Sequence, residues 1–156
     1  MTEVRRNKVV EALAREVIGK VSPVELPLLH PTAQRYFADP QGTLAARRSS
    51  DETLGFGVET AVVLLSPFAL DLAKSVLTRL FEGIGDAAAD GLAHRVLRWL
   101  KPDAGERNAQ GPEPLDAAQL ALVRQTANEE AHGLSLPPEQ STRLADALVA
   151  SLATRA

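Results

Sequence analysis

The stretch from Ser66 to Glu82 reads Ser-Pro-Phe-Ala-Leu-Asp-Leu-Ala-Lys-Ser-Val-Leu-Thr-Arg-Leu-Phe-Glu and has the clearest periodicity in this 156-residue chain. A turn of 100° per residue gathers apolar side chains on one side of a helix: Phe68, Leu72, Ala73, Val76, Leu77, Leu80 and Phe81. The opposite side collects polar residues: Asp71, Lys74, Thr78, Arg79 and Glu82. Ser66 is a favoured helix cap, and Pro67 suits a first turn. The pattern therefore predicts an amphipathic helix that begins at Ser66.

The segments on either side of this helix are also apolar. Residues 60–70 carry no charge. We favour a helix here, but the β-branched content leaves a short strand over residues 58–65 as an alternative. Further along, Asp86 can cap a second helix that ends at Lys101, just before a proline. Its apolar residues share one arc: Leu92, Ala93, Val96, Leu97, Trp99 and Leu100.

The N-terminal part of the chain combines a helical pattern with a proline-rich one. Apolar residues recur at helical spacing over residues 9–21, which predicts an amphipathic helix that ends before Pro23. Four prolines then follow within residues 23–40. We expect an extended segment there, with one short helical turn at residues 32–38, because proline cannot donate a backbone hydrogen bond. His30 falls in this segment without an evident partner.

The C-terminal part of the chain reads as two helices after a polar linker. Residues 102–114 are rich in Pro and Gly and have no apolar periodicity. Residues 115–155 then contain two helical patterns with a short connection, which is typical of an αα-hairpin. The sequence thus predicts a mostly all-α protein, a small irregular helical bundle divided into a helical core (1–101), a linker (102–114) and a helical hairpin (115–156).

Composition narrows the classes of function. Hydrophobic residues make up 45% of the chain and charged residues 24%, which is typical of a folded globular protein. The chain contains no cysteine, so disulfides, thiolate nucleophiles and sulfur-ligated metals are excluded. The apolar pattern of residues 9–18 is interrupted by charges, unlike the continuous run of a signal peptide. Together with the 13 Arg and abundant Ala of a GC-rich genome, this favours a bacterial-type cytoplasmic protein.

No motif in the chain points to catalysis or to a cofactor. The sequence has neither a Gly-x-Ser-x-Gly elbow nor a phosphate loop, so we assign no catalytic residue and no cofactor. Glu129 and His132 have the spacing of a carboxylate–imidazole pair on one helical face. A di-metal bundle needs a second such pair and further Glu residues, so we assign no metal ligand either.

Nucleic-acid binding is not expected. The formal net charge is −3, which gives no general field that attracts phosphates. The second helix of the hairpin offers only Arg143 before the terminal Arg155, whereas a recognition helix presents several basic or amide side chains.

The leading hypothesis is therefore a non-catalytic helical adaptor that binds another protein. A two-helix hairpin buries little surface by itself, so its Leu stripe has to pack on the main body, on a second copy or in a partner's groove. The stripe consists of Leu144, Leu148 and Leu152, which we take as candidate partner-binding residues.

Two alternatives remain open. The first is a peripheral membrane protein that uses the amphipathic segment 58–101. In this segment Trp99 lies opposite a basic strip, an arrangement that suits the lipid headgroup layer, and the candidate residues are Arg95, Arg98, Trp99 and Lys101. A transmembrane span is not expected, because the uncharged run of eleven residues falls short of the required length of about 20. The second alternative is a small enzyme with an acid–base site assembled from scattered carboxylates.

Overall fold

The computed structural model describes residues 3–44, 65–82, 88–89, 91–93, 96, 115–134 and 136–153. All regular structure in these ranges is helical, which confirms the all-α class. A short strand over residues 58–65 was the alternative to helix. Residue 65 has no regular structure, and residues 58–64 lie outside the described residues. The same holds for the predicted linker at 102–114.

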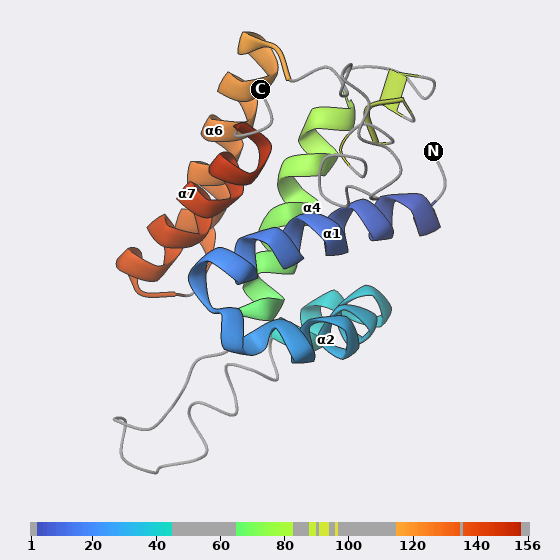
Figure 1. Ribbon diagram of the computed structural model, residues 1–156, viewed down its shortest axis with the longest axis vertical. Helices are drawn as coiled ribbons and strands as arrows, with labels where there is room; N and C mark the ends of the chain where they lie inside the picture. The colour runs from blue at the N-terminus through green and yellow to red at the C-terminus, as the bar shows by residue number, and fades with distance from the viewer. Residues whose placement is uncertain are drawn as a thin grey trace.

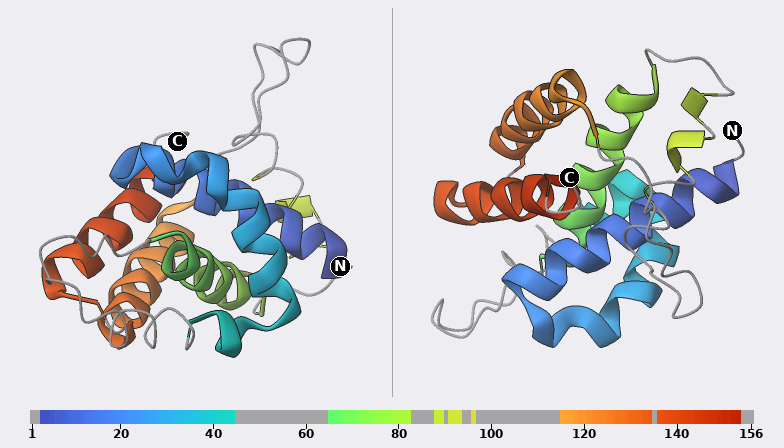
Figure 2. Two further views of the ribbon diagram at one scale, coloured as in Figure 1. Left: turned by 90° about the horizontal axis from the view of Figure 1, so that it is seen from below. Right: turned by 45° about the horizontal axis from the view of Figure 1, so that its top comes forward.

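Helix α4 (Ser66–Glu82) is the element around which the other helices pack. Viewed from below, it lies between α1 (Glu3–Val21), α2 (Leu26–Ala38) and α6 (Ala117–Gly133) (Figure 2). The seven apolar residues predicted on one face are all buried, from 0 to 5% exposed. Pro67, Ala69 and Leu70 are buried as well, so the first turns of α4 are enclosed on every side.

The C-terminal hairpin packs against the helices of the N-terminal half. Helix α6 packs against α4, and α7 (Pro138–Ala153) runs beside α6 and packs across α1 (Figure 1). Asp116 caps α6 through a reciprocal pair of bonds: its carboxylate accepts from the Gln119 N–H at 2.7 Å, and the Gln119 side-chain oxygen accepts from the Asp116 N–H at 3.0 Å. Pro138 begins α7, where no intrahelical N–H bond is lost.

Helix α1 ends at Val21, before Pro23, as its pattern predicts, and its apolar residues from Val9 to Ile18 are buried. Within the helix predicted to end at Lys101, the described residues 88–89, 91–93 and 96 are helical. Leu92, Ala93 and Val96 are buried, as expected from their shared arc.

The expectation of an extended proline-rich segment is wrong. The chain forms a 3-10 turn, η1 (Pro23–Glu25), and then runs directly into α2, with a further short helical segment at residues 40–44. Pro27 lies in the first turn, so only Pro31 removes an internal bond, at a cost of about 3 kcal/mol. Burial of large apolar side chains contributes about 1.5–3 kcal/mol each and offsets that cost. The buried residues of α2 are Leu29, Ala33 and Tyr36.

Candidate functional site

The most exposed apolar surface of the described residues lies where α1 turns into α2. The exposed fraction is 82% for Val24 and 47% for Leu28. Three exposed prolines lie within the same nine residues, and we refer to the set as the corner surface: Pro23, Val24, Pro27, Leu28 and Pro31. Exposed apolar residues that are contiguous, rather than scattered, are typical of an interaction site.

The corner surface is presented by a rigid piece of backbone. The Ser22 N–H donates to the Ile18 carbonyl at 2.8 Å, and the Glu25 N–H donates to the Ser22 carbonyl at 3.0 Å. Pro23 begins η1 and Pro27 lies in the first turn of α2, and each proline ring holds φ near its helical value. The chain therefore has few alternative conformations at this corner.

Glu25, which lies between Val24 and Leu26, points inward and is only 2% exposed. Its carboxylate caps the N-terminus of α4, forty residues further along the chain. One carboxylate oxygen accepts from the Leu65 N–H at 3.0 Å. The other accepts from the Ser66 N–H at 3.0 Å and from the Ser66 hydroxyl at 2.8 Å. A buried carboxylate is costly unless it is hydrogen-bonded, and these three donors meet that requirement.

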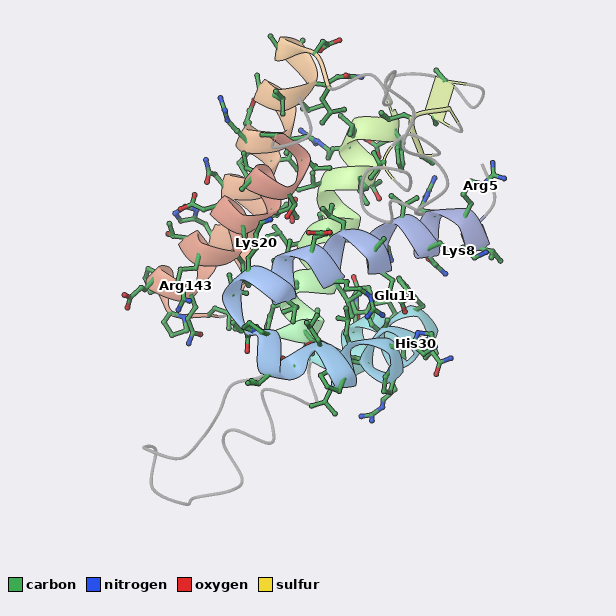
Figure 3. All side chains as sticks on the ribbon, in the orientation of Figure 1. Arg5, Lys8, Glu11, Lys20, His30 and Arg143 are labelled. Carbon is green, nitrogen blue, oxygen red and sulfur yellow. The ribbon has the colours of Figure 1, made fainter. Side chains whose placement is uncertain are left out.

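The residues of η1 and α2 carry few exposed charged or titratable side chains. Within residues 23–38, all of which the structure describes, the exposed side chains of charged type are His30 and Arg35. The acid in this range, Glu25, is buried. His30 pairs with Glu11 of α1 through its Nδ1, 2.8 Å from the carboxylate oxygen (Figure 3). The outer face of α2 therefore combines apolar residues with basic types and no exposed carboxylate.

A polar groove of about 680 Å³ adjoins the other end of α2. Its floor is the polar face of α4 that the periodicity predicts, and its walls are the 40–44 segment and Glu130 of α6. The Tyr36 hydroxyl donates to Asp71 at 2.6 Å, and the Lys74 ammonium lies 5.7 Å from the centre of the Tyr36 ring. Burial, followed by the hydrogen bond and the negative charge of Asp71, raises the pKa of Tyr36 well above 10.

The groove does not select a ligand by charge. Its lining contains three carboxylates, Asp39, Asp71 and Glu130, and two cations, Lys74 and Arg79. Asp71 is already bound to Tyr36, and Asp39 caps the 40–44 segment by accepting from the Gly42 N–H at 3.1 Å. The groove is therefore close to neutral, and two of its three acids have a structural partner.

Substitution Gly42→Ala is expected to give a free energy of unfolding about 1 kcal/mol lower than the matched helical substitution Gly19→Ala, the usual effect of losing a helix cap. A Cβ atom at Gly42 would occupy the space of the Asp39 carboxylate, which would have to leave the cap. Urea denaturation measures this change. Gly19→Ala is the matched control, because nothing lies within 4 Å of its Cβ position, and we expect it to stabilise α1. Equal free energies of unfolding for Gly42→Ala and Gly19→Ala would contradict the assigned cap.

The structure places the predicted Leu stripe inside the protein. Leu144, Leu148 and Leu152 are each 0% exposed, and α7 packs against α1 and α6. The stripe is therefore covered by the main body of the same chain, and not by a second copy or by a partner's groove. These residues were assigned to a partner on the assumption that the stripe is exposed. Because the stripe is buried, that assumption does not hold.

The candidate membrane residues, Arg95, Arg98, Trp99 and Lys101, lie outside the described residues, so their role stays a prediction. The part of segment 58–101 that forms α4 has its apolar face buried in the core. Within the described ranges, no helix combines the length and the apolar character needed to cross a membrane.

The two histidines among the described residues, His30 and His132, lie on different helices, α2 and α6. The His132 ring Nδ1 lies 2.6 Å from the Asn128 carbonyl, while Glu129 accepts from the Gln125 side chain at 3.1 Å. Both residues are exposed on α6. The prediction that His30 lacks a partner is wrong, because α2 is helical and faces Glu11 of α1. Three or more potential metal ligands do not cluster anywhere in the part of the chain that the structure describes.

Sequence reasoning missed the corner surface, Glu25 and the Tyr36–Asp71 pair. A usable signal was the spacing of Pro23, Pro27 and Pro31, four residues apart, which places the three prolines along one side of a helix. No local signal marks Glu25 as buried, because its partners follow forty residues later.

Comparison of the chain with family models, curated proteins and solved structures found no match.

Proposed function

We propose that this chain is a non-catalytic helical module that binds another protein, and that the corner surface receives an apolar segment with acidic residues. The observation that carries the proposal is the 82% exposure of Val24 beside Leu28, on a corner built from prolines.

The contrast with the rest of the described chain supports a binding role. Among all the described residues, three large apolar side chains are exposed: Val4, Val24 and Leu28. Two of these three lie on the corner surface. The Leu residues of α4 and α7 are fully covered. Exposed apolar area costs solubility, so a contiguous patch beside a well-filled core is best explained by a partner that covers it.

The chemistry of the partner follows from the charges. Arg35 is exposed on α2, His30 already pairs with Glu11, and Glu25 is turned inward. A partner segment with acidic residues at the edge of its apolar side chains would be complementary, and a basic segment would be repelled. The prolines add to affinity, because a surface that is already rigid loses little conformational entropy on binding.

Site-specific photo-crosslinking in cells that naturally express the protein tests this proposal. The photoreactive residue p-benzoylphenylalanine would replace Val24, and in a matched control it would replace Val4, which is 67% exposed at the far end of α1. We expect a cross-linked protein from position 24 and none from position 4. Mass spectrometry of the junction should identify a segment that is apolar and acidic.

Charge reversal makes the test specific. Arg35→Glu should lower the cross-linking yield at position 24 several-fold. Arg35→Lys should leave the yield unchanged, and so should Arg124→Glu, a charge reversal on the exposed face of α6. Cross-linking to phospholipid would contradict a protein partner at this surface. Cross-linking to a second copy of this chain, to a basic segment or to nothing would contradict the proposed partner.

The enzyme alternative and the cytoplasmic location stay predictions. The groove beside Tyr36 contains carboxylates, but its contacts are those of a structural hydrogen bond and a helix cap, so we do not assign it a reaction.

A further inference from the structure

We infer that Glu25 is the positioning residue of the corner surface and that it couples this surface to the first turn of α4. This inference rests on the proposed function, because it concerns the presentation of the same binding site. It assigns a role in binding to a side chain that is itself inaccessible to any partner.

The contacts of Glu25 join two segments that are far apart in sequence. Both carboxylate oxygens are used, with the Leu65 N–H on one and the Ser66 N–H and hydroxyl on the other. The two N–H groups belong to the start of α4, where backbone donors have no intrahelical partner and where a negative charge is favourable. Glu25 therefore acts as a helix cap supplied by a distant residue.

The same turn of backbone carries the cap and the exposed residues. Val24 precedes Glu25 directly, and Leu28 follows three residues later. Because the Glu25 side chain is held inward, Val24 is directed outward, as the 2% and 82% exposures show. If the carboxylate were released, η1 would be free to rotate, and Val24 and Leu28 would lose their fixed relation to each other.

The coupling acts in both directions. A partner that holds Val24 and Leu28 also holds η1 in the conformation that caps α4, and a well-formed first turn of α4 in turn favours the binding conformation. We therefore expect the amides of Leu65 and Ser66 to become more protected when the corner surface is occupied.

Glu25→Gln is the sharpest test, because it keeps the shape of the side chain and replaces one acceptor oxygen with an NH₂ group. The new NH₂ group would face a backbone N–H of Leu65 or Ser66. Two donors cannot bond to each other, so the hydrogen bond to that N–H would be lost. Amide hydrogen exchange, measured by NMR, should be about tenfold faster than in the wild type at Leu65, at Ser66 and in α2, which is the effect of losing a helix cap. Amides of α6 and α7 should exchange at the wild-type rate. The cross-linking yield from position 24 should fall several-fold.

Two controls separate positioning from general stability. Ser66→Ala removes only the hydroxyl donor, so both backbone bonds remain and the effect should be smaller than that of Glu25→Gln. Leu148→Ala weakens the core far from the corner, and at temperatures where it is folded we expect the wild-type yield at position 24.

The outcomes are distinguishable. Equal acceleration of exchange in all helices, or no change at Leu65 and Ser66, would overturn the role of Glu25 as a cap. Faster exchange with an unchanged yield at position 24 would overturn its positioning role and leave the proposed function intact. If the wild-type protein gives no cross-link, the proposed function and the positioning role both fail, while hydrogen exchange still decides whether Glu25 caps α4.

Discussion

Leu148→Ala is expected to lower the free energy of unfolding by about 2–5 kcal/mol, the range for truncating a fully buried Leu. Leu148 is 0% exposed, and its helix, α7, packs against α1 and α6. The loss combines the transfer free energy of the removed atoms with the cavity that remains. Urea denaturation followed by circular dichroism measures it.

The number of steps in the urea unfolding transition is as informative as its midpoint. Because the hairpin packs on α1 and α4, we expect helix loss to occur in a single step, with Leu148→Ala shifting that step as a whole. Leu28→Ala is the control: this side chain is 47% exposed, so we expect a change within about 0.5 kcal/mol. Two separate steps, with only one of them shifted, would instead show that residues 115–156 unfold as a unit of their own.

Tyr36 is expected to remain un-ionised in the folded protein at pH values where an exposed tyrosine forms its phenolate. Its pKa is raised above the ordinary value of 10, first by burial and then by the hydrogen bond to Asp71 and the charge of that residue. A raised pKa means that the stabilising contribution is complete below pH 10 and is lost as the pH rises above it. The protein should therefore lose stability in the alkaline range, and phenolate should appear together with unfolding.

The measurement is simple, because Tyr36 is the single tyrosine of the chain. The near-ultraviolet absorbance of phenolate, recorded against pH, reports this residue alone. Asp71→Asn should shift the titration to lower pH, yet keep it above the ordinary range, because the larger cause, burial, remains. Tyr36→Phe should cost about 1–2 kcal/mol at neutral pH through the lost hydrogen bond. It should also remove the alkaline loss of stability that Tyr36 causes. A titration near pH 10 in the folded protein would contradict the buried pair.

These contacts suggest a division of roles within the fold. The hairpin α6–α7 is joined to α1 and α4 through apolar side chains such as Leu144 and Val123. The segment formed by η1 and α2 adds polar links at three points: Glu25 of η1 to the start of α4, His30 to α1, and Tyr36 to Asp71. Hydrogen bonds are directional, whereas apolar contacts tolerate small shifts. The polar links therefore define the orientation of α2, the helix that carries most of the proposed binding surface.

Local sequence was sufficient for elements whose stability depends on their own periodicity and caps. The two faces of α4 follow from a repeat of 3.6 residues, and the start of α6 follows from Asp116, whose carboxylate reaches the Gln119 N–H within the same turn. Such signals span only a few residues, so no knowledge of the remaining chain is needed to interpret them.

Tertiary contacts determined the rest. Helix α2 forms in spite of Pro31 because Leu29 and Tyr36 are buried against α1 and α4, and that gain is absent from the local pattern. The Leu stripe of α7 is core and not surface because α1 lies beside it. Glu25 is buried and Val24 exposed, contrary to their hydropathies, because the donors that satisfy the carboxylate belong to Leu65 and Ser66. In each case the deciding free energy comes from groups brought together only by folding, and so it has no counterpart in the neighbouring sequence.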